Sequence, residues 1–381
     1  GTNLGDRVGN LGDALKKLEE LGESAVKVRD TSFLYESEAM YHEEQGKFLN
    51  AAVKIETSLS PLSLLNLLKT VESSLGRDFS TFRNGPRVID LDLLLYDDAL
   101  FDSREEAGAT EQDERWLRVP HLAVQEREFV LRPLADIAPA LRHPILQQTP
   151  GELLEKVLAT SRSTVHRVYP LSRSLVEPFS RPSTSITPSR TLVMSILNAT
   201  PDSFSDGGDN ATVPSAVPSA LSHLSSGAHI LDIGGMSTRP NAAEVSPGDE
   251  TARVLPLIRA LREEHGVTAP ISIDTFRPSV ARPAVAAGAT MINDVYGGRE
   301  PGMLAAMAKL GVPVVLMHSR GTPETMTSLT DYSADGGVVA GVRREMEEMV
   351  LAALDAGVLR WNILLDPGIG FAKTAAQNYE L

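Results

Sequence analysis

Two stretches in the first part of the chain carry apolar residues at helical spacing. The first stretch is predicted to end near Gly22, because glycine favours the C-terminal end of a helix. The second is predicted to begin at Ser60-Pro61, a favoured helix start. The apolar positions are Leu11, Ala14, Leu15, Leu18 and Leu21 in the first stretch, and Leu64, Leu65, Leu68 and Val71 in the second.

Two further stretches have the patterning of β-strands. Residues 48–56 alternate, with Leu49 on an aliphatic face and Phe48 and Asn50 on the other. Val88 to Tyr96 is strongly apolar and is interrupted by two aspartates. Helices mixed with such strands predict an α+β domain over residues 1–170, with an antiparallel or mixed sheet and flanking helices.

The pattern changes beyond residue 170. Residues 171–189 are rich in Ser, Thr and Pro, which predicts a linker. From 190 to 381, short β-branched runs alternate with helical stretches, which is typical of parallel βα units. A closed (β/α) barrel needs eight units, so we predict an incomplete TIM-type (β/α)8 barrel that lacks its last two. The six runs are Leu192–Leu197, His229–Ile233, Ile271–Asp274, Met291–Val295, Val314–Met317 and Ile363–Leu365, and the polar residues that end them are Asn198, Asp232, Asp274, Asn293, His318 and Asp366.

Composition excludes several function classes. The net charge of −14 argues against nucleic acid or an anionic membrane as the main partner. The chain has no Cys, so it can form neither disulfides nor a thiolate metal site. No apolar run approaches the ~20 residues that a membrane-spanning helix needs. Any phosphate-bearing substrate must therefore be bound by local cations, metal ions or backbone amides.

Asp90 and Asp92 are the first candidate site. Residues two apart in a strand point to the same face, so the two carboxylates can share one or two Mg²⁺ ions that bridge nucleotide phosphates. Arg77, Arg83 and Arg87 precede the pair closely, and arginine suits bidentate phosphate contacts. The alternative is structural: the two aspartates cap neighbouring loops or pair with these arginines.

These residues carry a resemblance to a known family. The segments Gly1–Arg7, Phe48–Ala51, Gly85–Asp92, Val119–His121 and Glu126-Arg127, in this order, resemble 6-hydroxymethyl-7,8-dihydropterin pyrophosphokinase. The resemblance implies Mg²⁺ on Asp90 and Asp92, ATP as co-substrate, and a transferase reaction. It also implies catalytic, phosphate-binding roles for Arg77, Arg87, His121 and Arg127, and a pterin held between Phe48 and Phe129 with Asn50 on its ring. The chain departs from the family at Asn84, where many members have Trp.

The later part of the chain resembles dihydropteroate synthase. The segments that carry this likeness are Ile196–Gly208, Leu231–Pro240, Ser272–Thr275, Ile292–Asp294 and Asp366–Phe371. The resemblance implies that Asn198 helps to bind Mg²⁺ and that Thr238 and Arg239 contact substrate. It places the pterin edge on Asp274, Asn293 and Asp366. For Asp232 the alternative of a loop cap stays open, and His318 is more often a packed histidine than a catalyst.

Together the two resemblances predict two consecutive steps of folate biosynthesis. The first transfers pyrophosphate from ATP to 6-hydroxymethyl-7,8-dihydropterin, and the second condenses the product with 4-aminobenzoate. We expect an internal fragment of a longer eukaryotic microbial protein, without synthase activity by itself. We also expect a homodimer for the intact protein, no nucleic-acid or membrane partner, and a cytoplasmic location with a mitochondrial one as the alternative. A kinase with a vestigial barrel and a non-catalytic pterin-binding scaffold are the competing hypotheses.

Overall fold

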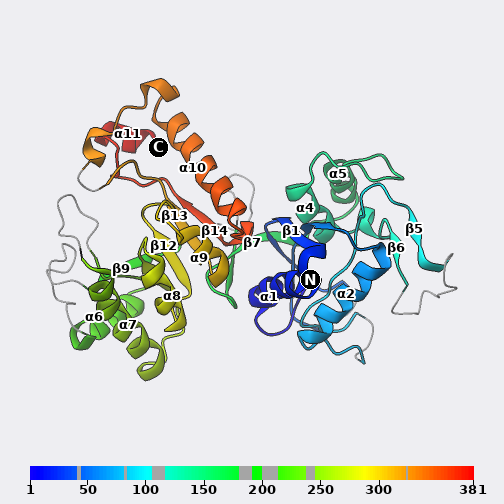
Figure 1. Cartoon of the computed structure of the whole chain (residues 1–381), viewed down its shortest axis with the longest axis horizontal. Coiled ribbons are helices and arrows are strands. Elements are labelled where there is room, and N and C mark those ends of the chain that lie inside the picture. Colours follow the sequence, from blue (N-terminus) through cyan, green and yellow to red (C-terminus); the bar gives the residue numbers. More distant parts are fainter. Residues whose placement is uncertain are drawn as a thin grey trace. The chain divides into compact units, whose positions relative to one another are not determined.

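A computed structural model describes residues 1–40, 44–80, 84–104, 116–179, 191–199, 213–236, 245–322 and 325–381. The chain divides into two compact units, Gly1–Ser189 and Arg190–Leu381 (Figure 1). Among the described residues, no helix is both long enough and apolar enough to cross a membrane.

The sheets of unit 1 are antiparallel. Four strands pair in the order β3-β2-β7-β8, β1 pairs with β4, and β5 pairs with β6. An α+β unit with antiparallel pairing was predicted, and the helices and antiparallel strands of unit 1 confirm it. The strands are β1 Val26–Thr31, β2 Leu34–Ser37, β3 Phe48–Asn50, β4 Val53–Thr57, β5 Phe101–Asp102, β6 Arg118–Val119, β7 Val165–Pro170 and β8 Val176–Pro178.

Both predicted helices of unit 1 are present. Helix α1 ends at Gly22, although Gly22 has φ −79° and the positive φ lies at Glu23 instead. Helix α2 begins as predicted, because the Ser60 side chain accepts a hydrogen bond from the Ser63 N–H and Pro61 occupies the first turn. Leu21 is 39% exposed and does not join the buried face. The helices are α1 Arg7–Gly22, α2 Pro61–Ser74, α4 Glu128–Ile137 and α5 Pro150–Thr160.

The strand predicted over residues 48–56 is wrong as one element. Ser32 and Ala52 exchange two hydrogen bonds of 2.9 Å, one of them through the serine hydroxyl, and these fix a break in the alternating run. The run therefore forms β3 and β4, which pair with different strands, β2 and β1. Local alternation predicted extended chain but did not predict which partner each half would take.

The strand predicted over Val88–Tyr96 is also wrong, because these residues belong to no strand. Their backbone is held by other partners: the Asp90 N–H donates to the Gly1 carbonyl at 2.8 Å, and the Leu91 N–H donates to the Glu72 side chain at 2.6 Å. Ile89 is nevertheless fully buried and Asp92 is exposed. Strand β8 lies within the stretch predicted as a linker.

The second unit contains one parallel sheet in the order β14-β13-β12-β11-β10-β9. This confirms the six predicted strands and their parallel arrangement, although the sheet is not closed into a barrel. The strands are β9 Met194–Asn198, β10 Ile230–Gly234, β11 Ile271–Asp274, β12 Met291–Asp294, β13 Val314–Met317 and β14 Ile363–Asp366.

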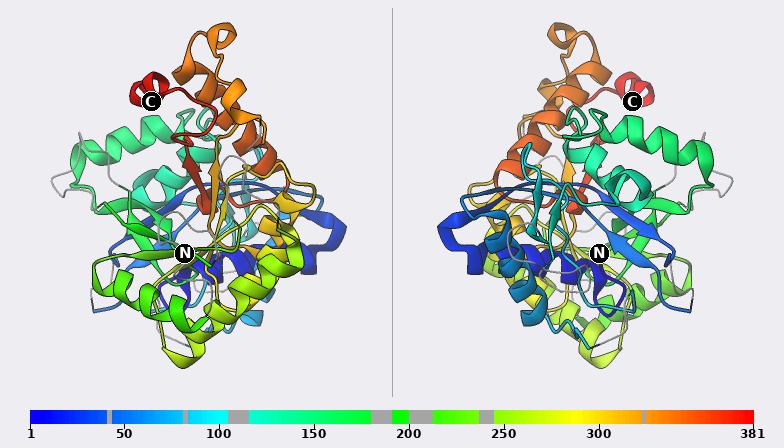
Figure 2. Two further views of the ribbon diagram at one scale, coloured as in Figure 1. Left: turned by 90° about the vertical axis from the view of Figure 1, so that its left-hand side faces the viewer. Right: turned by 90° about the vertical axis from the view of Figure 1, so that its right-hand side faces the viewer.

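Helices follow the strands and cover the sheet. Helix α6 packs against β9 and β10, and α8 packs against β11. The left view of Figure 2 shows α6 and α7, in green and yellow-green, in front of these strands. Fully buried Leu231, Ile273 and Leu257 belong to the large core between the strands and the helices. The helices are α6 Val213–Ser225, α7 Pro247–Arg259, α8 Pro278–Ala286, α9 Met303–Leu310, α10 Val338–Asp355 and α11 Ala375–Glu380.

Candidate active sites

Asp90 is the centre of an ion-pair cluster in unit 1. Its Oδ1 lies 2.5 Å from NH1 of Arg77, and its Oδ2 lies 2.7 Å from NH1 of Arg87. Burial raises the pKa of Asp90, but the Gly1 amino group and the two guanidinium groups outweigh that effect and lower the pKa to about 2. The carboxylate is therefore ionised at neutral pH and pairs with two arginines, as the structural alternative predicted for Asp90; Asp92 makes no such pair among the described residues.

Three further predicted residues lie near this cluster. Burial lowers the pKa of His121, and the negative charge of Asp92 and the positive charge of Arg127 act on it in opposite directions. The imidazole Nδ1 of His121 accepts a hydrogen bond from the Ala123 N–H at 3.2 Å, and the His121 N–H donates to the Leu94 carbonyl at 2.9 Å. The structure thus brings Asp90, Asp92, His121 and Arg127 into one electrostatic cluster.

The predicted pterin-binding residues lie on β3 and α4, which pack against each other. Arg87 lies over the Phe48 ring at 5.8 Å, and Arg127 lies over the Phe129 ring at 5.8 Å. Asn50 is buried, and its amide nitrogen donates to the Tyr35 carbonyl and to the Ser37 hydroxyl. Its Oδ1 lies beside Gly1, where an added Cβ would be 2.6 Å away.

The two aspartates fit a magnesium ion by their chemistry. Among the described residues, Asp92 is exposed and its side chain makes no hydrogen bond, and no group of three or more His, Asp or Glu side chains forms a metal cage. Mg²⁺ is usually bound by one or two carboxylates together with waters and substrate phosphates, so a complete protein cage is not required. Asp90 and Asp92 would hold the ion against the phosphates of a nucleotide.

The second site is a row of polar residues across four strands of unit 2. Strand register aligns Asn198, Gly234, Asp274 and Asn293 on β9, β10, β11 and β12. A Cβ placed on Gly234 would lie 3.3 Å from Oδ2 of Asp274 and 3.5 Å from Oδ1 of Asn198. The glycine therefore leaves room for these two side chains to approach each other from either side.

Asp232 supports this row from within β10. It is buried, and its Oδ2 accepts a hydrogen bond from the Asn293 amide nitrogen at 3.0 Å, whereas its Oδ1 has no hydrogen-bond partner among the described residues. The alternative of a loop cap is wrong, because Asp232 lies inside the strand. Burial raises the pKa of Asp232; burial, followed by the charge of Asp232, raises the pKa of Asp274 well above its ordinary value.

Asp366 lies at the end of β14, where the following loop is fixed by close contacts. Its Oδ1 accepts from the Gly368 N–H at 2.7 Å, and its backbone carbonyl accepts from the His318 N–H at 2.8 Å. Gly368 has φ +67°, and a Cβ there would lie 1.9 Å from the His318 carbonyl oxygen. Only glycine allows this approach.

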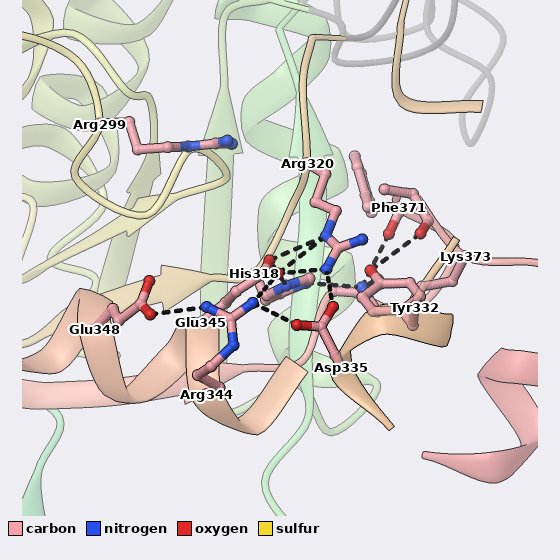
Figure 3. Close-up of polar contacts among 12 residues, drawn as sticks. Arg299, His318, Arg320, Tyr332, Asp335, Arg344, Glu345, Glu348, Phe371 and Lys373 are labelled. Atoms are coloured by element: carbon pink, nitrogen blue, oxygen red, sulfur yellow. Dashed lines mark hydrogen bonds and ion pairs between the residues drawn. The ribbon is translucent and has the colours of Figure 1, made fainter. Parts of the chain in front are cut away.

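Lys373 and His318 connect that loop to helix α10 (Figure 3). The Lys373 ammonium donates to His318 Nδ1 at 3.0 Å and to two carbonyls of its own loop, Gly368 and Phe371. Since Nδ1 accepts, His318 carries its proton on Nε2, which donates to Glu345 at 2.8 Å. His318 is thus a buried, fully bonded histidine, as its structural interpretation predicted.

The network extends to the surface through arginines. Arg320 is paired with both Glu345 and Asp335 and lies 3.8 Å over the Tyr332 ring. Arg344 bonds the other Asp335 oxygen at 2.7 Å (Figure 3). The sequence reasoning missed Lys373, Glu345, Gly234 and Glu72. Thr238, Arg239 and Arg83 lie outside the described residues.

Comparison with known proteins assigns both units to families. Residues 1–139 match the family model of 7,8-dihydro-6-hydroxymethylpterin-pyrophosphokinase, and residues 194–381 match that of the pterin binding enzymes. The mitochondrial folate synthesis bifunctional protein of Pisum sativum is 39% identical over 393 residues, which cover 99% of this chain and 72% of the relative. The chain belongs to the bifunctional folate synthesis protein family.

Other relatives extend this result. The folic acid synthesis protein fol1 of Schizosaccharomyces pombe is 43% identical over 379 residues and 99% of this chain. The chain spans about half the length of this relative and of its Pneumocystis carinii counterpart, 47% and 48%. The solved HPPK-DHPS of Plasmodium falciparum with pteroate is 21% identical, with a TM-score of 0.75, and the match covers 100% of this chain and 82% of that one. That likeness shows a shared fold of both units.

Proposed function

We propose that unit 1 transfers pyrophosphate from ATP to the hydroxymethyl group of 6-hydroxymethyl-7,8-dihydropterin. The hydroxymethyl oxygen forms a bond to the β-phosphorus of ATP, the bond from that phosphorus to the α,β-bridging oxygen breaks, and AMP leaves. The observation that carries this proposal is the grouping of exposed Asp92 with Asp90, His121 and Arg127 in one electrostatic cluster, which ion pairing of Asp90 with arginines does not by itself explain. Family membership supports it.

Positioning and charge neutralisation supply most of the catalysis in phosphoryl transfer. Arg77 and Arg87 offer guanidinium groups within one cluster, and each is suited to bidentate contact with phosphate oxygens. His121 and Arg127 add further donors beside Asp92. Mg²⁺ bound by Asp90 and Asp92 would neutralise phosphate charge there.

We propose that unit 2 binds the pterin product and contributes to its condensation with 4-aminobenzoate. Asp274, Asn293 and Asp366 offer acceptors and donors that match the edge of a pterin ring, and Asn198 offers an oxygen for Mg²⁺. The row of Asn198, Gly234, Asp274 and Asn293 at one level of the sheet supports this proposal.

A homodimer and a cytoplasmic location complete the proposal. Two plant relatives, from Pisum sativum and Arabidopsis thaliana, are named as mitochondrial proteins, which supports the mitochondrial alternative. Fusion of a reporter to the full-length protein and microscopy would separate the two locations.

Release of AMP tests the function of unit 1. The chain is incubated with ATP, Mg²⁺ and 6-hydroxymethyl-7,8-dihydropterin, and AMP is measured. We expect Asp92→Ala to abolish pterin-dependent release while leaving the far-ultraviolet circular dichroism unchanged, because Asp92 is exposed and makes no hydrogen bond among the described residues. Asp98→Ala, an exposed carboxylate six positions later, is the matched control. Turnover near wild type in Asp92→Ala would contradict the assignment.

A further inference from the structure

Glu72 is a fully buried carboxylate in unit 1 that none of the roles assigned above uses. It belongs to α2 and lies on the apolar side of that helix, four residues after Leu68 and seven after Leu65. A carboxylate is almost never fully buried unless it is paired. Its partners therefore indicate what it does.

The partners of Glu72 belong to the candidate phosphate site. Its Oε1 lies 2.6 Å from NH1 of Arg77 and accepts the Leu91 N–H, also at 2.6 Å. Both of its oxygens also accept from Lys69, at 3.1 and 3.0 Å. Leu91 is the residue between Asp90 and Asp92, so a single side chain bonds both an arginine of the site and the backbone between the two aspartates.

Arg77 is shared between two carboxylates. Its NH1 lies 2.5 Å from Oδ1 of Asp90 and 2.6 Å from Oε1 of Glu72. A divalent cation that binds Asp90 competes with Arg77 for the same oxygen. When the cation takes the Asp90 oxygen, Glu72 remains as the anionic partner of the Arg77 guanidinium. Arg77 therefore stays in the site without being bound to Asp90.

We propose that Glu72 is a positioning residue of the metal and phosphate site: it retains Arg77 and fixes the Asp90–Asp92 backbone, so that Asp90 can exchange Arg77 for a divalent cation. This inference rests on the proposed pyrophosphoryl transfer. If Glu72 loses its charge, Asp90 is the remaining carboxylate that pairs with Arg77 in the cluster. Arg77 then competes more strongly with the cation for the Asp90 oxygen.

Direct cation binding tests the inference. Mn²⁺ is titrated into the full chain with the non-hydrolysable analogue α,β-methylene-ATP, and free Mn²⁺ is measured by electron paramagnetic resonance. We expect Glu72→Gln to weaken Mn²⁺ binding about tenfold, the order expected when one charge-assisted interaction is redistributed. Asp136→Asn is the matched control, because Asp136 is a partly buried carboxylate that accepts from the Phe33 N–H and the Tyr35 hydroxyl away from the aspartate pair.

A double variant separates positioning from general damage to the fold. If Arg77 competes for Asp90, then Arg77→Met added to Glu72→Gln should bring Mn²⁺ binding measured without nucleotide, where phosphate contacts of Arg77 play no part, back toward the wild-type value under the same conditions, whereas general damage would not be repaired by a second substitution. Glu72→Asp keeps the charge on a shorter side chain and provides a second test if Glu72→Gln does not fold; we expect intermediate Mn²⁺ affinity.

The outcomes are distinct from those of the proposed function. Wild-type Mn²⁺ affinity in Glu72→Gln, or no recovery in the double variant, would overturn the role of Glu72. If only Glu72→Asp folds, a Mn²⁺ affinity of that variant equal to wild type would also overturn the role of Glu72. Absence of pterin-dependent AMP release by the wild-type chain would instead overturn the proposed function, because the Mn²⁺ titration measures binding without turnover.

Discussion

Replacement of Gly368 by alanine is expected to damage the loop that follows β14 far more than other glycine substitutions nearby. The Gly368 backbone has φ +67°, and the added Cβ would lie 1.9 Å from the His318 carbonyl oxygen. Ordinary van der Waals contact requires the two backbones to separate by roughly 1 Å or more. The ends of β13 and β14 would have to move apart at the position of Asp366.

The size of the effect follows from two contributions. A non-glycine residue in the left-handed region costs roughly 1–2 kcal/mol. Separation of the two backbones also endangers three hydrogen bonds, worth about 1 kcal/mol each: His318 N–H to the Asp366 carbonyl, Gly368 N–H to Asp366 Oδ1, and Lys373 to the Gly368 carbonyl. The expected loss in the free energy of unfolding is therefore about 4–5 kcal/mol if all three bonds are lost.

Gly370→Ala is the matched control. Gly370 lies in the same loop with φ +87°, but a Cβ there would meet no atom within 4 Å. This substitution should show only the conformational cost of roughly 1–2 kcal/mol. The difference between the two variants isolates the contact with His318 from the cost of the backbone conformation.

Urea unfolding measures both variants in a background that reports on unit 2. The chain has two tryptophans, and Trp116→Phe leaves buried Trp361, directly before β14, as the fluorescent residue. If Gly368→Ala unfolds with the same free energy as Gly370→Ala, the close approach of the two loops is not rigid and the reasoning is refuted.

Two further predictions concern the same unit. Burial lowers the pKa of Lys373 to about 8. Between pH 8 and the ordinary pKa of lysine, the unfolded chain therefore binds more protons than the folded chain. The free energy of unfolding should accordingly rise by about 1–2 kcal/mol up to pH 9.5. Lys373→Met should lack this rise in urea unfolding at pH 7.5, 8.5 and 9.5; a parallel pH dependence in both proteins would exclude the lysine as its source. Asp232→Ala should weaken binding of 6-hydroxymethylpterin roughly tenfold by calorimetry, because Asn293 loses the acceptor that orients its amide. Exposed Asp355→Ala is the control, and an unchanged affinity in Asp232→Ala would refute the orienting role.

Residue spacing predicted those elements whose partners lie close in sequence or repeat regularly. The six strands of unit 2 were predicted because each is a short apolar run between helices, and every neighbouring pair in the sheet is also a neighbour in sequence. In unit 1, β3 and β4 pair with strands that alternation cannot identify, so residues 48–56 were predicted as one strand. The apolar run at 88–96 bonds to α2 and to the first residues through single contacts, which no local pattern specifies.

In the candidate sites too, some residues could be predicted from the sequence and others could not. Residue type and position singled out the acidic and basic groups that are proposed to bind substrate, such as Asp90 and Asp274. The groups that hold them were missed because their environment, rather than their type, gives them their role. In the sequence, Lys373 looks like an ordinary solvent-exposed lysine of a loop. In the structure, three acceptors surround its ammonium group.

Glu72 and Asp232 show what such residues share. Each is a carboxylate in the apolar interior of a regular element, where hydrophobic patterning alone favours a leucine or valine. Burial of an ionised carboxylate without partners costs several kcal/mol, so such a residue needs nearby donors, and where these do not outweigh burial its pKa rises, as it does for Asp232. In Glu72 those donors are Arg77, Lys69 and the Leu91 amide, and in Asp232 the donor is Asn293. An acidic residue on the apolar stripe of a helix or strand therefore predicts a neighbouring polar site. Asp232 was already singled out by its apolar run, and this rule would also have located Glu72 from the sequence.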